Sequence, residues 1–247
     1  MKRFLFLIVA FACGLNELRS AAPSDVEQII PWLLEERREL KGIPFADVVF
    51  AATRKKVLRI DTEQAGDRDL VSKIGGALDR VLEEMNASRG AAKSARRINE
   101  VSARFEKAIR ESLNQVRGFR CEFPKTATGR VQRSGYPDLR LVDTADGRVV
   151  YLDPKLYEQG SRESTLRTFY YEPKKETNKV LDDAHHLLLA IEHDGGRAGD
   201  WKFLGWTIVD LARFQVRLKA EFQGSNRDLY RAETIVGTSQ RKLDPVR

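Results

Sequence analysis

The stretch YPDLRLVDTADGRVVYLDPK, residues 136–155, carries the pattern that decides the fold. Apolar-rich runs over residues 138–143 and 148–153 are separated by the turn residues Thr144-Ala145-Asp146-Gly147, which predicts an antiparallel hairpin. If this tetrapeptide is the turn, residues whose numbers sum to 291 face each other, and Asp138 lies opposite Asp153. A turn shifted by one residue would instead place Asp138 opposite Lys155.

The charged residues of this hairpin suit phosphodiester chemistry. Directly opposed residues of an antiparallel pair have Cβ atoms roughly 5 Å apart, so Asp138 and Asp153 are expected to be close enough to share one cation. Side chains alternate along a strand, so Asp153 and Lys155 share a face. Two hard oxygen ligands beside a lysine are what a magnesium-dependent phosphodiesterase needs.

Apolar periodicity predicts the elements on either side of the hairpin. We expect helices over residues 25–40, 67–85, 93–116 and 175–192, and strands over residues 119–123 and 202–209. Residues 214–222 alternate apolar and polar side chains, which favours a half-buried strand, although their spacing also fits a helix. The change from helical to alternating periodicity near Gly118 predicts one sheet flanked by the helices of residues 93–116 and 175–192.

From residue 93 onward the expected order is helix, strand, strand, strand, helix, strand. With Pro137-Asp138 entering the second strand and Asp153-Pro154-Lys155 ending the third, residues 93–210 resemble the PD-(D/E)xK, or restriction-endonuclease-like, superfamily. The resemblance implies an α/β (α+β) fold, with an αβββαβ core around a central mixed sheet. The nuclease-like domain would occupy residues 93–247, after a mostly helical region over residues 23–92. The resemblance also implies a divalent metal, Mg²⁺ or Mn²⁺, and hydrolysis of nucleic acid, with DNA favoured over RNA.

The resemblance assigns a role to each residue of the motif. Asp138 and Asp153 would be metal ligands, with the carbonyl of Pro154 as a third ligand. Lys155 would position the attacking water and offset charge on the scissile phosphate. Family members often add an acid from the preceding helix, and Glu106 lies nearest to the edge of that helix's apolar stripe. Because proline cannot donate to a sheet ladder, either the strand ends at Asp153 with a bulge that aims the site, or the motif is a chance match.

Basic residues gather just before the hairpin, against the single acid Glu122. They are Arg117, Arg120, Lys125, Arg130 and Arg133. A basic approach to the site would bind phosphates, whereas the alternative is a solvated loop. The net charge of +7 (43 minus 36) fits a polyanionic partner. The run Phe169-Tyr170-Tyr171 would either stack on bases or pack half into the core.

The N-terminus has the pattern of a secretory signal peptide over residues 1–22. Lys2 and Arg3 precede a ten-residue apolar run that ends at Cys13, and small residues follow up to Ala22. We therefore expect export to the periplasm or the medium, without stable membrane insertion after processing. Two alternatives are a lipid-modified Cys13 and a buried N-terminal strand or helix. Removal of this segment would leave a charge of +5 (40 minus 35) and a single cysteine, Cys121, expected to be a buried small hydrophobe.

Other residue patterns favour no competing chemistry. His185 and His186 are adjacent on an expected helix, where they point about 100° apart and cannot chelate one ion together. His185 is expected to be a core histidine, and His193 to lie at the end of that helix. The sequence has no Gly-rich phosphate loop, nucleophile elbow or Cys-His pairing. The leading hypothesis is an exported metal-dependent nuclease. The alternatives are a non-catalytic nucleic-acid-binding or assembly module on the same fold, and an exported structural protein.

Overall fold

The computed structural model describes residues 29–31, 41–87, 98–166, 168–196, 201–219 and 224–236. The chain divides into two units, of which Lys41–Leu218 contains the sheet and its helices. The other unit combines Met1–Leu40 with Lys219–Arg247. In it the structure describes a helical turn at residues 29–31 and the short helix α5 (Asn226–Leu229). The rest of the helix expected over residues 25–40, and the expected signal segment, lie outside the described residues.

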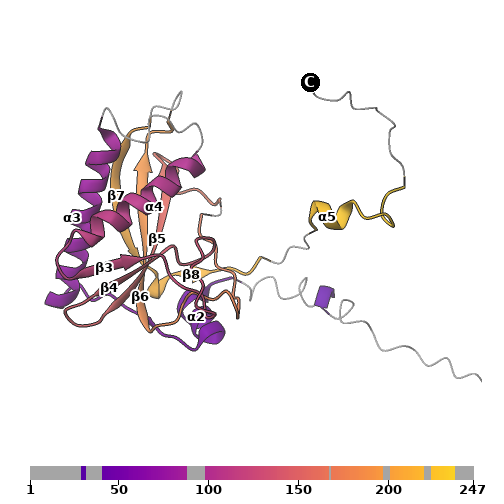
Figure 1. Ribbon diagram of the computed structural model, residues 1–247, viewed down its shortest axis with the longest axis horizontal. Coiled ribbons are helices and arrows are strands. Elements are labelled where there is room, and N and C mark those ends of the chain that lie inside the picture. The colour runs from indigo at the N-terminus through magenta and orange to yellow at the C-terminus, as the bar shows by residue number, and fades with distance from the viewer. Residues whose placement is uncertain are drawn as a thin grey trace, which may run out of the picture. The chain divides into compact units, whose positions relative to one another are not determined.

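Six strands form a mixed sheet in the order β2-β6-β5-β4-β3, and β7 pairs with the remaining length of β6 beside β2 (Figure 1). Their bounds are β2 (Val57–Leu58), β3 (Phe119–Glu122), β4 (Leu139–Asp143), β5 (Val149–Glu158), β6 (Ala184–His193) and β7 (Phe203–Asp210). The central strand β6 runs parallel to β2 and β5, and the other pairs are antiparallel. The predicted mixed sheet is confirmed, as are the strands expected at β3, β4, β5 and β7.

The register of the β4–β5 hairpin is the one set by the four-residue turn. Leu139 faces Leu152 and Val142 faces Val149, so the paired residue numbers sum to 291. The backbone N–H of Asp138 also donates to the carbonyl of Leu152, at 3.2 Å, which brings Asp138 to the point opposite Asp153. The register that would have opposed Asp138 to Lys155 is wrong.

Two helices cover one face of the sheet, α3 (Ala65–Asn86) and α4 (Ile98–Asn114) (Figure 1). Both confirm helices predicted from apolar residues at steps of three and four. The buried stripe of α3 includes Leu70, Ile74 and Leu78, and it packs with α4 against Leu139 and Leu152 of the hairpin. This aliphatic cluster is the main core of the sheet-containing unit, and burial on this scale is the dominant favourable term in folding.

A second, more aromatic cluster lies on the opposite face of the sheet, against the residues of β5 and β6 that alternate along the strands with those of the aliphatic cluster. It includes Phe45 of the helix α2 (Phe45–Thr53), Tyr151 of β5 and Ala184 of β6. Leu211 of the 3₁₀ turn η3 (Leu211–Arg213) is also a buried member of this cluster. The short strands β1 (Ile43–Pro44) and β8 (Gln215–Val216) come from distant parts of the sequence and pair antiparallel, so residues 215–216 adopt the strand alternative.

The helix predicted over residues 175–192 is wrong. Residues 184–193 form the central strand β6, and residues 175–183 form an irregular segment before it. The run from Leu187 to Ile191 is continuously apolar because a central parallel strand is buried on both faces. A continuous run also contains every helical spacing, so periodicity alone did not separate the two structures.

The correction to β6 changes the account of the histidines. Neighbouring strand residues point to opposite faces, so His185 and His186 are still unable to chelate one ion together. His185 is buried as expected, and its Nδ1 lies 3.2 Å from the carbonyl oxygen of Leu58. His193 ends the strand β6, so its expected place at the end of a helix is wrong.

Candidate active site

Asp138, Asp153 and Lys155 converge where β4 begins and β5 continues alone beside β6. The amine of Lys155 lies 2.9 Å from both Oδ1 and Oδ2 of Asp153 and 3.5 Å from Oδ2 of Asp138. The hairpin register supplies this geometry, because it aligns Asp138 with Asp153 and alternation returns Lys155 to the same face. The structure therefore brings together the three side chains that the sequence pattern singled out.

The carboxylate of Asp153 has the features of a hard-cation ligand. Its side chain is 4% exposed, and only Oδ1 accepts a hydrogen bond from Lys155. Oδ2 is buried and, among the residues that the structure describes, has no hydrogen-bond donor with suitable geometry, although the amine is close to it. Buried polar atoms are rarely left unsatisfied, and an oxygen with a free lone pair beside a second carboxylate suits Mg²⁺. The residues present fit a divalent metal.

Electrostatics at the site also favour a bound cation. Burial and the neighbouring Asp153 raise the pKa of Asp138 to about 7, although Lys155 opposes the shift. Burial acts to lower the pKa of Lys155, but Asp153 and Asp138 outweigh it, so its pKa is raised. Two carboxylates at hydrogen-bond range with one shared amine repel each other, and a divalent ion between them would relieve that repulsion.

Pro154 does not end the strand. β5 continues through it to Glu158, and Pro154 pairs with Leu189 of β6 without a bulge, so the expected strand end at Asp153 is wrong. The carbonyl of Leu152 faces β4, and the backbone groups of residues two apart point the same way. The nitrogen of Pro154, which carries no hydrogen, therefore points to the side where β4 has not yet begun, and no ladder hydrogen bond is lost there. The carbonyl of Pro154 faces the same open side, next to Asp153.

Glu106 of α4 has a different ion-pair partner from Asp138 and Asp153, which both contact Lys155. Its Oε2 pairs with Nη2 of Arg133 at 3.0 Å, and its side chain is largely buried. Its charge nevertheless acts to raise the pKa of a buried lysine, Lys179, on which Asp138 and Asp153 act in the same direction. Glu106 thus borders the site, and its part in holding a metal stays a prediction.

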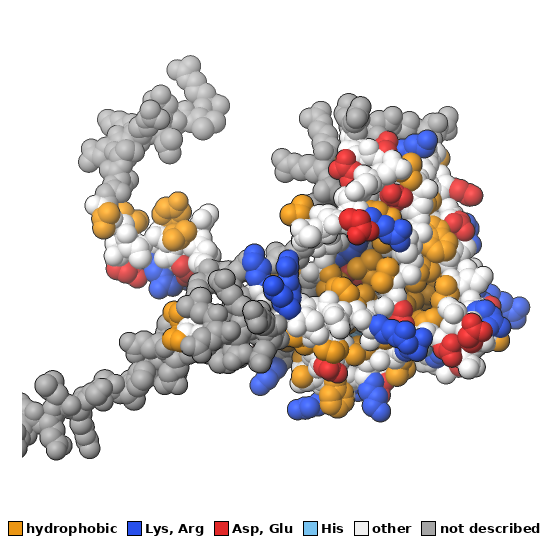
Figure 2. Space-filling model, turned by 180° about the vertical axis from the view of Figure 1, so that it is seen from behind, with side chains coloured by type: hydrophobic (Ala, Val, Ile, Leu, Met, Phe, Trp, Pro, Cys, Tyr) orange, Lys and Arg blue, Asp and Glu red, His pale blue; other side chains and the backbone are white. Residues whose placement is uncertain are grey.

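The basic residues predicted to approach the site are all exposed: Arg117, Arg120, Lys125, Arg130 and Arg133. Arg133 pairs with Glu106, and its guanidinium carbon lies 4.9 Å from the centroid of the Phe123 ring. Arg110 also lies over this ring, at 4.8 Å. On the face shown in Figure 2, Lys and Arg side chains are interspersed with Asp and Glu around an area of hydrophobic side chains.

The sequence interpretation missed two buried groups near the site. Lys179 is 1% exposed, and its amine donates to the carbonyls of Gln132 and Gly135. The hydroxyl of Tyr136 lies 2.7 Å from Nδ1 of His186, whose pKa burial lowers to about 3. Phe169 and Tyr171 pack against Tyr136, which supports the core alternative for the aromatic run. A lysine that follows Asn178 in an irregular segment gives no local sequence signal of burial.

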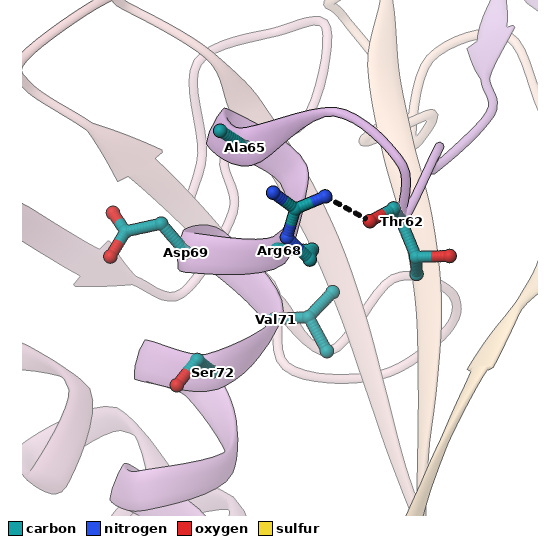
Figure 3. A pocket seen from close by; sticks show the side chains of 6 residues that line it. All are labelled: Thr62, Ala65, Arg68, Asp69, Val71 and Ser72. Carbon is teal, nitrogen blue, oxygen red and sulfur yellow. Dashed lines mark hydrogen bonds between the residues drawn. The ribbon is translucent and has the colours of Figure 1, made fainter.

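Two hollows lie on the described part of the sheet-containing unit. One, of about 210 Å³, is lined by residues from the segments 132–136 and 170–179, among them Tyr136 and Lys179. The other, of about 690 Å³, is a wide, open depression at the start of α3 (Figure 3). Its Arg68 donates to the carbonyl of Thr62 at 2.9 Å and its Asp69 pairs with Lys73, and it contains none of the predicted site residues. The larger hollow is therefore not the candidate site.

Comparison with known proteins decides the family. A model of the type II restriction enzyme MjaV family matches residues 38–233. The chain is also 30% identical over 223 residues to the type II restriction enzyme MjaV of Methanocaldococcus jannaschii, covering 86% of this chain and 94% of that protein. The chain belongs to this family. The resemblance to restriction endonucleases is thereby confirmed, and the family consists of nucleases that act on DNA.

Family membership also corrects the expected location. Type II restriction enzymes are cytoplasmic nucleases, so the predicted export, and with it the lipid-modified Cys13, is wrong. A positive start followed by ten apolar residues is a short and unspecific pattern, which explains the error. Within the described ranges, no helix is long and apolar enough to cross a membrane. Cys121 is buried, as predicted.

Proposed function

We propose that this chain is a metal-dependent DNA endonuclease whose catalytic residues are Asp138, Asp153 and Lys155. The observation that carries the proposal is the convergence of two carboxylates and a lysine amine, with a buried Asp153 oxygen that accepts no hydrogen bond from the described residues. The family supplies DNA as the substrate, and the relative's name supplies cleavage at a defined sequence as the mode of action.

Asp138, Asp153 and the carbonyl of Pro154 would hold Mg²⁺ or Mn²⁺. A bound divalent ion supplies positive charge to the phosphate oxygens and makes a water molecule a stronger nucleophile at neutral pH. Asp153 lies on β5 and Asp138 comes directly before β4, so the hairpin register holds the two carboxylates opposite each other.

Lys155 has a separate role in the proposal. Its raised pKa keeps the amine protonated at neutral pH, where it carries a fixed positive charge beside both carboxylates. When the carboxylates face a metal, the amine is free to donate to the attacking water or to a phosphate oxygen. Such preorganised charge lowers the barrier because it needs no reorganisation during the reaction.

The basic loop before the hairpin would contact the DNA backbone. Lys125, Arg130 and Arg133 are exposed on the segment that leads directly into Asp138, and Arg120 is exposed on β3. Phosphate contacts of this kind position the duplex without reading its sequence. Glu106 would orient Arg133 through their ion pair, in addition to any contact with the metal.

Digestion of plasmid and phage DNA in the presence of Mg²⁺ tests the proposal. We expect discrete fragments whose sequenced ends share one short recognition sequence, and no cleavage with EDTA. The variants Asp138→Asn and Asp153→Asn should lose cleavage, whereas Asp47→Asn, an exposed acid on α2, serves as the matched control. DNA binding without cleavage by the wild-type protein at any divalent ion would leave the non-catalytic binding module as the function.

A further inference from the structure

Lys179 occupies an unusual place for a lysine, since it is almost fully buried next to the candidate active site. Its amine donates hydrogen bonds to the carbonyl of Gln132, at 3.3 Å, and to the carbonyl of Gly135. Gly135 comes three residues before Asp138 in the chain. Two backbone carbonyls of the loop that delivers Asp138 to the site therefore depend on this one side chain.

The segment around Lys179 is itself fixed on both sides. On one side, the carbonyl of Asn178 accepts a backbone hydrogen bond from Ala127 at 2.8 Å. On the other side, the hydroxyl of Tyr151 accepts from the backbone N–H groups of Leu181 at 2.9 Å and Asp182 at 3.1 Å. Residues 178–182 thus join the loop of residues 125–135 to strand β5, and Lys179 lies between the two attachments.

The charges around Lys179 connect it to the carboxylates. Burial lowers the pKa of Lys179, while Asp138, Asp153 and Glu106 act to raise it, so all three acids lie within its electrostatic reach. In return, Lys179 acts to lower the pKa of Asp138. Only 1% of the Lys179 surface is exposed, so we expect it to act on the reaction through the groups that its amine holds.

We propose that Lys179 is a positioning residue, which anchors the loop of residues 125–135 through Gln132 and Gly135 and thereby sets the place of Asp138. This inference rests on the proposed nuclease function for its catalytic consequence. Its structural part, the anchoring of the loop, stands on the hydrogen bonds alone. Neither Lys179 nor its partners belong to the sequence motif of the superfamily.

The variant Lys179→Met tests the proposal, because methionine fills a similar volume without the amine. We expect amide hydrogen exchange in residues 126–138 of the full chain to become faster, while the helices α3 and α4 keep their protection. We expect the single-turnover cleavage rate to fall about 100-fold, as small displacements of a catalytic group can cause. DNA affinity, measured without a divalent ion, should stay close to that of the wild-type protein.

The matched control is Lys174→Met, an exposed lysine of the same segment that lines the same hollow and pairs with Glu172. Its rate and affinity should stay within about two-fold of wild type, as expected for a solvent-exposed ion pair. If Lys179→Met does not fold, Lys179→Gln, which keeps one donor, takes its place.

Three results would overturn the inference. The first is unchanged exchange in residues 126–138. The second is a cleavage rate that stays at the wild-type level despite faster exchange. The third is a loss of affinity as large as the loss of rate, which would make Lys179 a DNA contact. If the wild-type protein does not cleave DNA at all, the proposed function fails, and the exchange comparison still decides whether Lys179 holds the loop.

Discussion

The two faces of β5 have different surroundings. Val150 and Leu152 are fully buried in the aliphatic cluster beneath α3 and α4. Tyr151 and Asp153 alternate with them and turn to the other side, where aromatic rings, buried lysine and histidine side chains and the second carboxylate gather. Because side chains alternate along β5, one face of the strand packs into the core and the other carries the candidate catalytic residues. Substitutions on the first face should change the free energy of unfolding, and substitutions on the second should change rates and metal binding.

The largest effect is expected on the chemical face, from Asp153→Asn. Cleavage should fall by more than about a thousand-fold, equivalent to about 4 kcal/mol of activation free energy. Mg²⁺ affinity, measured by calorimetry, should weaken severely because one of two carboxylate ligands is lost. The free energy of unfolding should change far less than the cleavage rate, because the repulsion between Asp153 and Asp138 is removed and Lys155 keeps its ion pair with Asp138. Unfolding of the variant at room temperature would contradict the separation of the faces.

On the opposite face, Leu152→Ala should act mainly on stability. Leu152 is fully buried, so its truncation should lower the free energy of unfolding by about 2–5 kcal/mol in urea titrations. The cleavage rate of the folded fraction should stay within about ten-fold of wild type, because the hairpin register still aligns the carboxylates. A rate loss as large as that of Asp153→Asn would show that the two faces are not independent.

Lys155→Ala should separate two roles on the face that carries Asp153, namely turnover and metal binding. Removal of the general acid–base or charge-stabilising amine should reduce turnover by about 10²–10⁴-fold. Mg²⁺ binding should persist or tighten, since a positive charge near the metal is removed. Calorimetry and single-turnover kinetics on the same preparation check both parts, and a weakened metal site would argue that Lys155 is needed to hold the carboxylates in place.

The pH dependence of the site follows from Asp138. Its pKa in the folded protein is raised to about 7, so the folded state holds a proton that the unfolded state releases at lower pH. The contribution of Asp138 to stability is therefore present below the unfolded pKa and is lost as pH rises toward about 7. Mg²⁺ affinity should rise over the same range, because the metal competes with this proton. Both dependences should be much reduced in Asp138→Asn, and a flat affinity profile in the wild-type protein would contradict the assignment.

The smallest effect is expected from Arg133→Gln, on the loop that leads to the site. One lost phosphate contact should weaken DNA binding by a factor that shrinks with added salt and reduce the slope of log affinity against log salt by about 1. The exposed Arg59, changed to Gln, is the control. An unchanged slope would remove Arg133 from the DNA interface and leave it as the partner of Glu106.

Local patterns predicted the hairpin because the information was local. The turn at residues 144–147 sets the register, and this register places Asp138 opposite Asp153. The helices α3 and α4 followed from one-sided apolar stripes. By contrast, the strand β6 is apolar on both faces, and its identity depends on its neighbours β5 and β7, which a local pattern does not contain.

Long-range polar contacts explain the rest of what was missed. Lys179 reaches carbonyls that lie 44 and 47 residues earlier in the chain, and the hydroxyl of Tyr136 reaches a histidine 50 residues later. No spacing rule links such partners. The predicted export failed for the opposite reason, since a short apolar run is a local pattern that many unrelated sequences share.

Pro154 has a consequence for how the molecule meets other chains. Beyond the start of β4, residues 154–158 of β5 pair with β6 alone among the described strands, and unpaired strand groups are where sheets extend. Proline at this point removes a donor and makes that edge a poor template for intermolecular sheet growth. The residue that looks out of place in a nuclease motif therefore also makes the sheet harder to extend beside the carboxylates.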